Sequence, residues 1–237
     1  MTNLEDALVA VDAGADAVGF VFYDKSPRCV TVEMAREIVE KLPESVEKIG
    51  VFVGSDSDPI KVLLEAGLTG TQSYVSAEGV AGSNASTKAI GMDLLPSRAR
   101  SLMAFPMSLF GDDVSQVERM AADFAESRRK LPEGISIPEG WMDTFLLDSG
   151  NLRQPGGTGH AFDWSGAQAL AEGMRKDGLK LVVAGGLTPE NVGDAIRILE
   201  PWGVDVSSGV EAAPGKKDPE KVRAFVKAVR EMDRRVT

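Results

Sequence analysis

Apolar residues recur along this chain in two alternating patterns, one with helical spacing and one with the unbroken run of a buried strand. Leu4, Ala7, Leu8 and Val11 share one helical face, and Gly14 is suited to end that helix. Residues 17–23 are almost entirely apolar, as expected for a strand that is covered on both faces. The same reasoning predicts helices at 3–13, 32–42, 60–66, 114–129, 163–176, 189–199 and 218–232, and strands at 17–23, 48–53, 142–148, 179–184 and the start of 203–216.

The pattern is weaker in the middle of the chain. Residues 70–75 have the composition of a strand, and one more strand lies in 87–92 or in 102–109, of which the second is favoured. Residues 77–87 and 131–140 are rich in Gly, Ser, Asn or Pro and are predicted to be loops.

Strand and helix alternate with short connections, which predicts one domain over residues 1–237 with a parallel sheet covered by helices. Chemically active residue types follow several strands, so we expect an α/β TIM barrel of the (β/α)₈ type rather than an open sheet. We find about seven strands. Residues 187–196, which follow a strand, are similar to residues 2–8, so we expect the chain to start just after a missing first strand. Its absence would leave two unpaired sheet edges.

Small, donor-rich residues follow two of the last strands. Gly185 and Gly186 end one strand, and Ser207, Ser208 and Gly209 end the next. Glycine lets a backbone approach a bound group closely, and loops of this kind at the carboxyl ends of barrel strands hold phosphate groups. The alternative is a pair of ordinary turns. A third strand ends in an acid, Asp148, at the same predicted end of the barrel.

Composition narrows the function further. The formal net charge is −10 without a basic run, so neither nucleic acid nor an anionic membrane surface is an expected partner. Cys29 and His160 are the only residues of their kinds, which argues against disulfides and against a metal site. No apolar stretch is long enough to cross a membrane, and the first residues do not have the pattern of a signal peptide. We therefore expect a cytoplasmic protein. The sequence does not reveal its oligomeric state, and a monomer and a homodimer both remain open.

Several rare strings occur together and in order, and as a set they resemble the phosphoribosylanthranilate isomerase family of tryptophan biosynthesis. The resemblance covers residues 1–66 and 142–237 and is poor over 70–140. The matching segments are residues 2–7, 14–23, 26–28, 50–53, 147–149, 154–159 with 162–164, 184–192, and 205–211 with 214–216.

The resemblance implies an Amadori rearrangement of a phosphorylated aldose N-glycoside of anthranilate, with no cofactor and no metal. An acid must protonate the ring oxygen and a base must remove the proton from C2. Asp148 matches the family's general acid, and burial at a strand end favours the protonated form that this role needs. Arg28 matches the arginine that binds the anthranilate carboxylate, and Asp205 matches a polar residue of the site. By the same resemblance, Gly185, Gly186, Ser207, Ser208 and Gly209 form the phosphate cradle, and Gly156 and Gly157 belong to a loop that closes over the substrate.

The general base is where the sequence departs from the family. The family places a cysteine in a Lys-Ile-Cys-Gly-like string on the first barrel strand, and that string would precede Thr2. Cys29 follows a different strand, so it is expected to be a small packed residue rather than the base, and His160 is expected to be an exposed loop residue. The segment at Gln72 to Tyr74 is expected to be an altered form of the family's Gln-Leu-His string.

Three functional hypotheses follow. The first is an isomerase of this family whose first strand, with its cysteine, is missing from the sequence. The second is a barrel that binds phosphorylated ligands without turning them over. The third is a different phosphosugar isomerase or lyase on the same scaffold, with Asp16 or Asp24 as the base.

Overall fold

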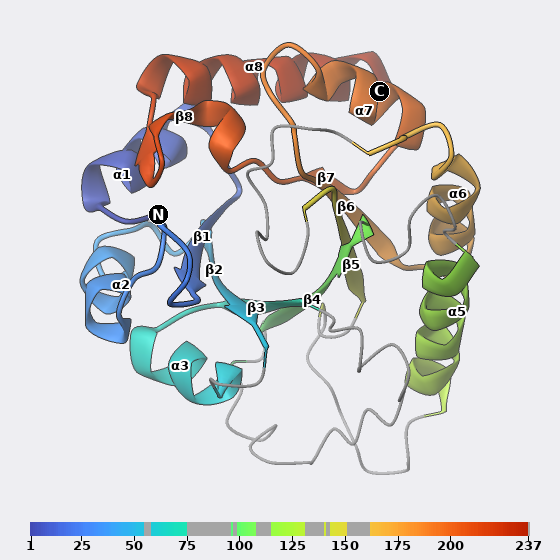
Figure 1. The fold of residues 1–237 in the computed structure, drawn as a ribbon, viewed down its shortest axis with the longest axis horizontal. Coiled ribbons are helices and arrows are strands. Elements are labelled where there is room, and N and C mark those ends of the chain that lie inside the picture. The colour runs from blue at the N-terminus through green and yellow to red at the C-terminus, as the bar shows by residue number, and fades with distance from the viewer. Residues whose placement is uncertain are drawn as a thin grey trace.

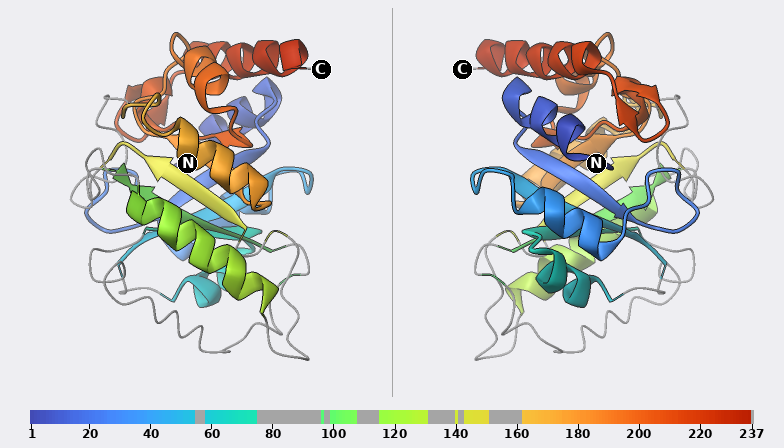
Figure 2. Two further views of the ribbon diagram at one scale, coloured as in Figure 1. Left: turned by 90° about the vertical axis from the view of Figure 1, so that its right-hand side faces the viewer. Right: turned by 90° about the vertical axis from the view of Figure 1, so that its left-hand side faces the viewer.

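The computed structural model describes residues 1–54, 58–74, 99–107, 115–130, 143–150 and 162–236, together with Pro96 and Gly140. In these ranges the chain forms a curved parallel sheet that wraps around a central space, with helices on its outer side (Figure 1). The side views show the helices stacked against the outside of the strands (Figure 2). The predicted barrel-type α/β architecture is therefore confirmed.

The described elements alternate in the predicted order. The helices are α1 (Leu4–Ala13), α2 (Val32–Val39), α3 (Pro59–Ala66), α5 (Ser115–Arg129), α6 (Gln168–Lys176), α7 (Val192–Leu199) and α8 (Pro219–Val236), with a 3₁₀ helix η3 (Ser208–Val210). The strands of the large sheet are β1 (Ala17–Phe22), β2 (Glu47–Val53), β3 (Gly70–Tyr74), β4 (Arg100–Pro106), β5 (Thr144–Asp148), β6 (Lys180–Ala184) and β7 (Gly203–Val204). The choice of a strand near 102–109 is confirmed by β4, whereas 77–87 and most of 131–140 lie outside the described residues.

The seven strands pair in sequence order, from β1 to β7, and every pair is parallel. Within the described part of the chain, β1 pairs only with β2 and β7 only with β6, so the sheet stays open between its first and last strands. The expected open barrel with two unpaired edges is thus present, and the opening lies beside α1 and α8 (Figure 1).

Local chemistry explains where the first helix begins and ends. The Asn3 side chain caps α1 by accepting a hydrogen bond from the Asp6 backbone N–H at 2.8 Å. Gly14 ends the helix in the left-handed conformation, with φ of 95°, which glycine adopts without the steric cost that a Cβ would add.

Two features near the carboxyl terminus differ from the sequence-based expectation. The strand that begins at Gly203 was expected to continue through Ser207, but β7 ends at Val204. The chain then forms η3 and a small antiparallel hairpin of β8 (Glu211–Ala213) and β9 (Lys216–Lys217), which periodicity did not predict. Because β7 has a neighbour on one side only, little holds its later residues in an extended ladder.

The main core lies between the sheet and the helices, where large side chains such as Phe20, Phe105 and Phe145 are fully buried. A smaller apolar cluster inside the sheet consists of Ala104, Leu146, Val182 and Ala184. Side chains normally fill the interior of a small barrel. Here a cavity of about 590 Å³ extends from the barrel interior to the gap between β7 and β1, where α8 forms part of its wall. The interior is therefore incompletely filled on the open side of the sheet.

Helices, rather than strands, close the ring on that side. α1 packs against α8, and Arg230 of α8 reaches back to the beginning of the chain. Its Nη2 atom donates to the Gly14 carbonyl at 2.9 Å and pairs with the Asp16 carboxylate at 2.7 Å. In the described ranges, no helix combines the length and the apolar character needed to cross a membrane.

Candidate active site

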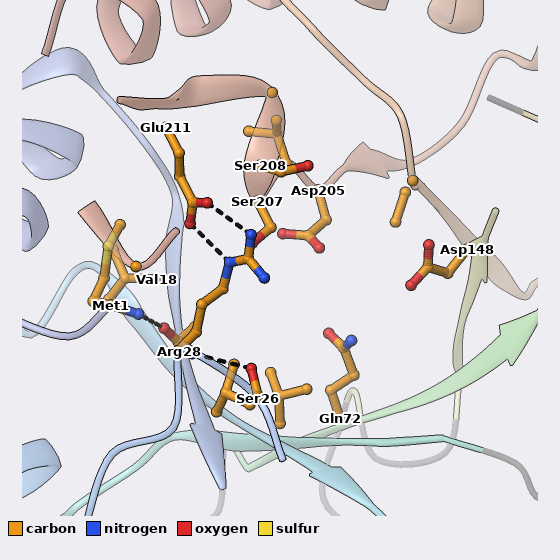
Figure 3. Close-up of a pocket in the computed structure, with 18 of the residues that line it drawn as sticks. Met1, Val18, Ser26, Arg28, Gln72, Asp148, Asp205, Ser207, Ser208 and Glu211 are labelled. Carbon is orange, nitrogen blue, oxygen red and sulfur yellow. Dashed lines mark hydrogen bonds and ion pairs between the residues drawn. The ribbon is translucent and has the colours of Figure 1, made fainter. Parts of the chain in front are cut away.

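A cavity of about 150 Å³ opens at the carboxyl ends of the strands, and most of the predicted site residues line it (Figure 3). The predicted residues in its lining are Arg28, Asp148, Gly185, Gly186, Asp205, Ser207, Ser208 and Gly209. They come from segments far apart in the sequence that the parallel strands bring to one end of the barrel. Gly156, Gly157 and His160 fall outside the described residues.

Asp148 is the last residue of β5, and only 1% of its surface is exposed. Its Oδ1 atom accepts the Gly150 N–H at 2.8 Å, and its Oδ2 atom accepts the Tyr74 hydroxyl at 2.5 Å. Two donors therefore fix the orientation of the carboxyl group. Because each carboxyl oxygen has two lone pairs, a position for a proton remains on either atom.

The two glycine-containing loops contact each other closely. A Cβ on Gly209 would lie 1.8 Å from the Leu187 carbonyl oxygen, and a Cβ on Gly185 would lie 2.1 Å from Ser149 Oγ. Gly185 and Gly186 also have φ of 82° and 63°. Asn191 supports the first loop, since its Nδ2 atom donates to the Gly186 carbonyl at 2.9 Å. Neither Gly185 nor Gly209 could carry a side chain here without displacing a neighbouring segment.

Arg28 follows β1 and is held by a carboxylate that the sequence analysis gave no role. Its Nε and Nη2 atoms donate to the two carboxylate oxygens of Glu211 at 2.8 and 2.7 Å (Figure 3). This fork-to-fork pair is geometrically specific and leaves Nη1 outside it. Arg28 thus lines the cavity, and Glu211 gives it its orientation.

Asp205 follows β7 and points into the cavity together with Asp148 (Figure 3). Asp205 is exposed to the open cavity, but desolvation by the surrounding protein groups raises its pKa, the negative charge of Asp148 raises it further, and Lys217 acts in the opposite direction. Two carboxyl groups thus face one cavity. The Asp205 carboxyl group, just after β7, is protonated more easily than that of an ordinary aspartate.

The proposed substitutes for the base do not reach this cavity. Cys29 is partly exposed rather than packed, and its Sγ atom lies 3.8 Å from Asp24 Oδ1, away from the residues that line the site. Asp24 is exposed and is likewise absent from the lining. Asp16 pairs with Arg230 at the opposite end of β1 from the site. Cys29 is therefore only partly packed, and its neighbours Ser26 and Arg28, rather than Cys29 itself, line the cavity.

Sequence reasoning missed four contributors, Tyr74, Glu211, Lys217 and Asp6, which line the cavity or brace its walls. The altered Gln72 to Tyr74 string was a usable signal, because both of its end residues line the cavity. Glu211 and Lys217 carried no local signal, since their contacts join distant segments. In the ranges that the structure describes, no three His, Cys, Asp or Glu side chains are grouped closely enough to hold a metal ion.

Known proteins resemble this chain over nearly its whole length. The family model of N-(5'phosphoribosyl)anthranilate (PRA) isomerase matches residues 137–228. The N-(5'-phosphoribosyl)anthranilate isomerase of Pseudomonas fluorescens (strain Pf0-1) is 39% identical over 231 residues, which cover 97% of this chain and 95% of that protein. This chain belongs to the phosphoribosylanthranilate isomerase family. The enzyme of the same name from Rubrobacter xylanophilus is 42% identical over 230 residues, covering 97% of this chain and 96% of the relative.

Solved structures of the phosphoribosylanthranilate isomerase family share the fold. The crystal structure of the enzyme from Thermotoga maritima has a TM-score of 0.71 and 34% identity, with 98% of this chain and 96% of that chain covered. A family structure in complex with reduced 1-(o-carboxyphenylamino)-1-deoxyribulose 5-phosphate has a TM-score of 0.69 and 33% identity, with 98% and 95% covered. The ligand of that relative carries a phosphate and an aromatic carboxylate.

Proposed function

We propose that this chain isomerises N-(5'-phosphoribosyl)anthranilate to 1-(2-carboxyphenylamino)-1-deoxyribulose 5-phosphate, an Amadori rearrangement in L-tryptophan biosynthesis, as a cytoplasmic monomer or homodimer. The observation that carries the proposal is that one cavity brings together a buried carboxyl group, an oriented arginine and two glycine loops. Family membership supports the same reaction. A substrate with an anionic group at each end fits a site that has anion-binding groups on two sides.

In this proposal Asp148 is the general acid. It protonates the ring oxygen of the ribose, which opens the ring to the imine. Asp148 is buried at the end of β5, and the hydrogen bonds from Tyr74 and Gly150 hold its carboxyl group in one orientation. Both features suit a group that must deliver a proton to one defined atom.

The phosphate of the substrate binds at the loops of Gly185 and Gly186 and of Ser207 to Gly209. The position of both loops in the cavity lining supports this assignment, because glycine lets the backbone come close to a bound group. The anthranilate carboxylate binds Arg28, whose pairing with Glu211 leaves one guanidinium nitrogen outside the ion pair. Gly156 and Gly157 are proposed to belong to the loop that closes over the bound substrate.

We further propose that the general base enters on an additional strand between β7 and β1. Among the residues that the structure describes, neither strand has a partner on that side, and a cavity of about 590 Å³ lies there. The Met1 backbone nitrogen already donates to the Gly19 carbonyl of β1. A segment joined ahead of Met1 would therefore start at the edge of the gap between β7 and β1, which we call the slot. Its carboxyl end would lie at the same end of the barrel as Asp148, which suits a base that removes the C2 proton.

The test adds a strand to the chain ahead of Met1. Three extensions are compared: a strand of alternating apolar residues ending in Lys-Ile-Cys-Gly, the same strand with alanine in place of the cysteine, and a version with prolines that cannot pair. The first two should raise the melting temperature, and the cysteine version should isomerise the substrate about 10²–10⁴-fold faster than the alanine version.

The outcomes separate the competing hypotheses. Equal rates for the cysteine and alanine extensions would show that the base is elsewhere. If neither raises the melting temperature above that of the proline version, the slot does not accept a strand. Ligand binding without turnover in all three versions would favour the phosphosugar-binding barrel over the enzyme.

A further inference from the structure

A row of charged groups joins the two anion sites of the cavity. It runs from Arg28 through Glu211 and Lys217 to the backbone of Ser207. The Glu211 carboxylate accepts two hydrogen bonds from Arg28, and its Oε1 atom lies 3.4 Å from Lys217 Nζ. Lys217 Nζ in turn donates to the Ser207 carbonyl at 2.9 Å. The three side chains are 17%, 5% and 11% exposed, so the row is largely shielded from water.

The two central members of the row lie opposite each other in the β8–β9 hairpin, where Glu211 is the register partner of Lys217. The hairpin is anchored at several points. The Lys217 backbone N–H donates to Asp6 Oδ2 at 2.7 Å, and the Thr2 hydroxyl donates to the Gly215 carbonyl at 2.5 Å. The row therefore rests on an element that is tied to the start of α1.

The charges of the row agree with its geometry. Burial raises the pKa of Glu211, but the hydrogen bond from Arg28 and the charge of Lys217 outweigh burial, so the pKa is lowered overall. Two cations flank the Glu211 carboxylate, so it is paired on both sides. Removing Glu211 would leave Arg28 and Lys217 partly buried without the carboxylate that separates them.

We propose that Glu211 and Lys217 form a spacer that fixes Arg28 relative to the Ser207–Gly209 loop, and so selects ligands by the separation of their two anionic groups. The proposal rests on the function proposed above, which assigns the carboxylate to Arg28 and the phosphate to the loop. Glu211 acts through Arg28 and Lys217 acts through Ser207, so both are positioning residues. A ligand with one anion needs only one end of the spacer, whereas a ligand with two anions needs both ends at the correct distance.

The experiment measures dissociation constants by calorimetry for two probes. Inorganic phosphate reports the loop alone, and reduced 1-(o-carboxyphenylamino)-1-deoxyribulose 5-phosphate reports both ends. Glu211→Gln should weaken the two-anion probe roughly 10- to 100-fold, as expected for lost hydrogen bonds to a charged group, and change phosphate affinity less than about threefold. Glu211→Asp keeps the charge and should recover part of that loss. Lys217→Met should weaken both probes.

Glu47→Gln is the matched control. Glu47 pairs with Arg100 at 3.1 Å at the opposite ends of the strands, so this variant removes the same kind of pair without touching the spacer. Neither probe should bind it differently from the unmodified chain. Glu211→Asp supplies the comparison if Glu211→Gln does not fold.

Each failure has its own signature. If the unmodified chain binds the two-anion probe no more tightly than phosphate, Arg28 does not bind the carboxylate. The spacer proposal, which depends on that assignment, is then also wrong. The unmodified chain should bind the two-anion probe more tightly than phosphate, as proposed. If Glu211→Gln and Glu211→Asp then show the same difference in affinity between the probes, the proposed function stands and the spacer proposal is wrong. An equal loss for both probes in Glu211→Gln would also overturn it, because the effect would be general damage to the site.

Discussion

The hydroxyl of Tyr74 lies 2.5 Å from Asp148 Oδ2 and donates a hydrogen bond to it across the intervening strand β4. Burial raises the pKa of Tyr74 well above its ordinary value, and the charge of Asp148 raises it further. Tyr74 therefore remains a protonated donor through the alkaline range. This contact ties the orientation of the proposed acid to the end of β3.

Tyr74→Phe should lower kcat/KM about 2- to 10-fold, because it removes a hydrogen bond of about 0.5–1.5 kcal/mol that orients the protonated Asp148 carboxyl group. The effect should fall mainly on kcat, since the ring still fills its place in the wall. Steady-state kinetics of the strand-extended chain would measure it. A variant with unchanged kcat and raised KM would show that Tyr74 contacts substrate instead of orienting Asp148.

Asp148→Asn should reduce kcat about 10²–10⁴-fold, the usual contribution of a general acid. Asp143→Asn is a control just before the start of the same strand, where Asp143 pairs with Lys180 at 2.8 Å. That change should lower stability without a comparable loss of kcat. Equal kinetic losses in the two variants would mean that β5 is simply disturbed.

Gly209→Ala should destabilise the chain by about 1–3 kcal/mol and weaken phosphate binding, because the added Cβ would overlap the Leu187 carbonyl oxygen. Gly173→Ala makes the same change in α6, where a Cβ meets nothing within 4 Å. It should stabilise the chain by about 0.5–1 kcal/mol. Urea denaturation and phosphate titration of both variants would check the pair; a tolerated Gly209→Ala would contradict the close approach of the loops.

The stability of the chain should depend on pH through Asp205. Its folded-state pKa is raised above the ordinary 3.8, so the folded state binds the proton more tightly than the unfolded state. The resulting stabilisation is full below the unfolded-state value and is lost as the pH rises through the folded-state value. Asp205→Asn should remove this loss, so the variant should gain stability relative to the unmodified chain between acidic and neutral pH. Denaturation midpoints at several pH values would measure it, and parallel curves would contradict it.

The elements with strong local signals could be predicted from the sequence. α1 has an apolar face, an Asn3 cap and a terminal Gly14, and each of these acts within a few residues. Asp148, Gly185 and Gly186 could be placed at one end of the barrel because parallel strands bring their carboxyl ends together. The expected gap also followed from counting strands.

The parts that could not be predicted depend on contacts between distant segments. β7 ends at Val204 because pairing on one side, rather than its alternating valines, decides its length. The short strands around Glu211 and Lys217 have too few residues for a periodic pattern. The pairing of Arg28 with Glu211 spans 183 positions of sequence, and nothing local to either residue indicates it.

The closure of the ring by α1 and α8 has a consequence for synthesis of the chain. Chains emerge from the ribosome amino terminus first. α1 therefore cannot pack against α8 until this 18-residue helix has been synthesised. Only then can Arg230 reach Asp16 and Gly14. Until that moment the apolar faces of α1 and of the curved sheet have no cover on the open side. Synthesis of α8 is thus the step that completes the shell, and nascent chains that stop before α8 are expected to be substrates for chaperones.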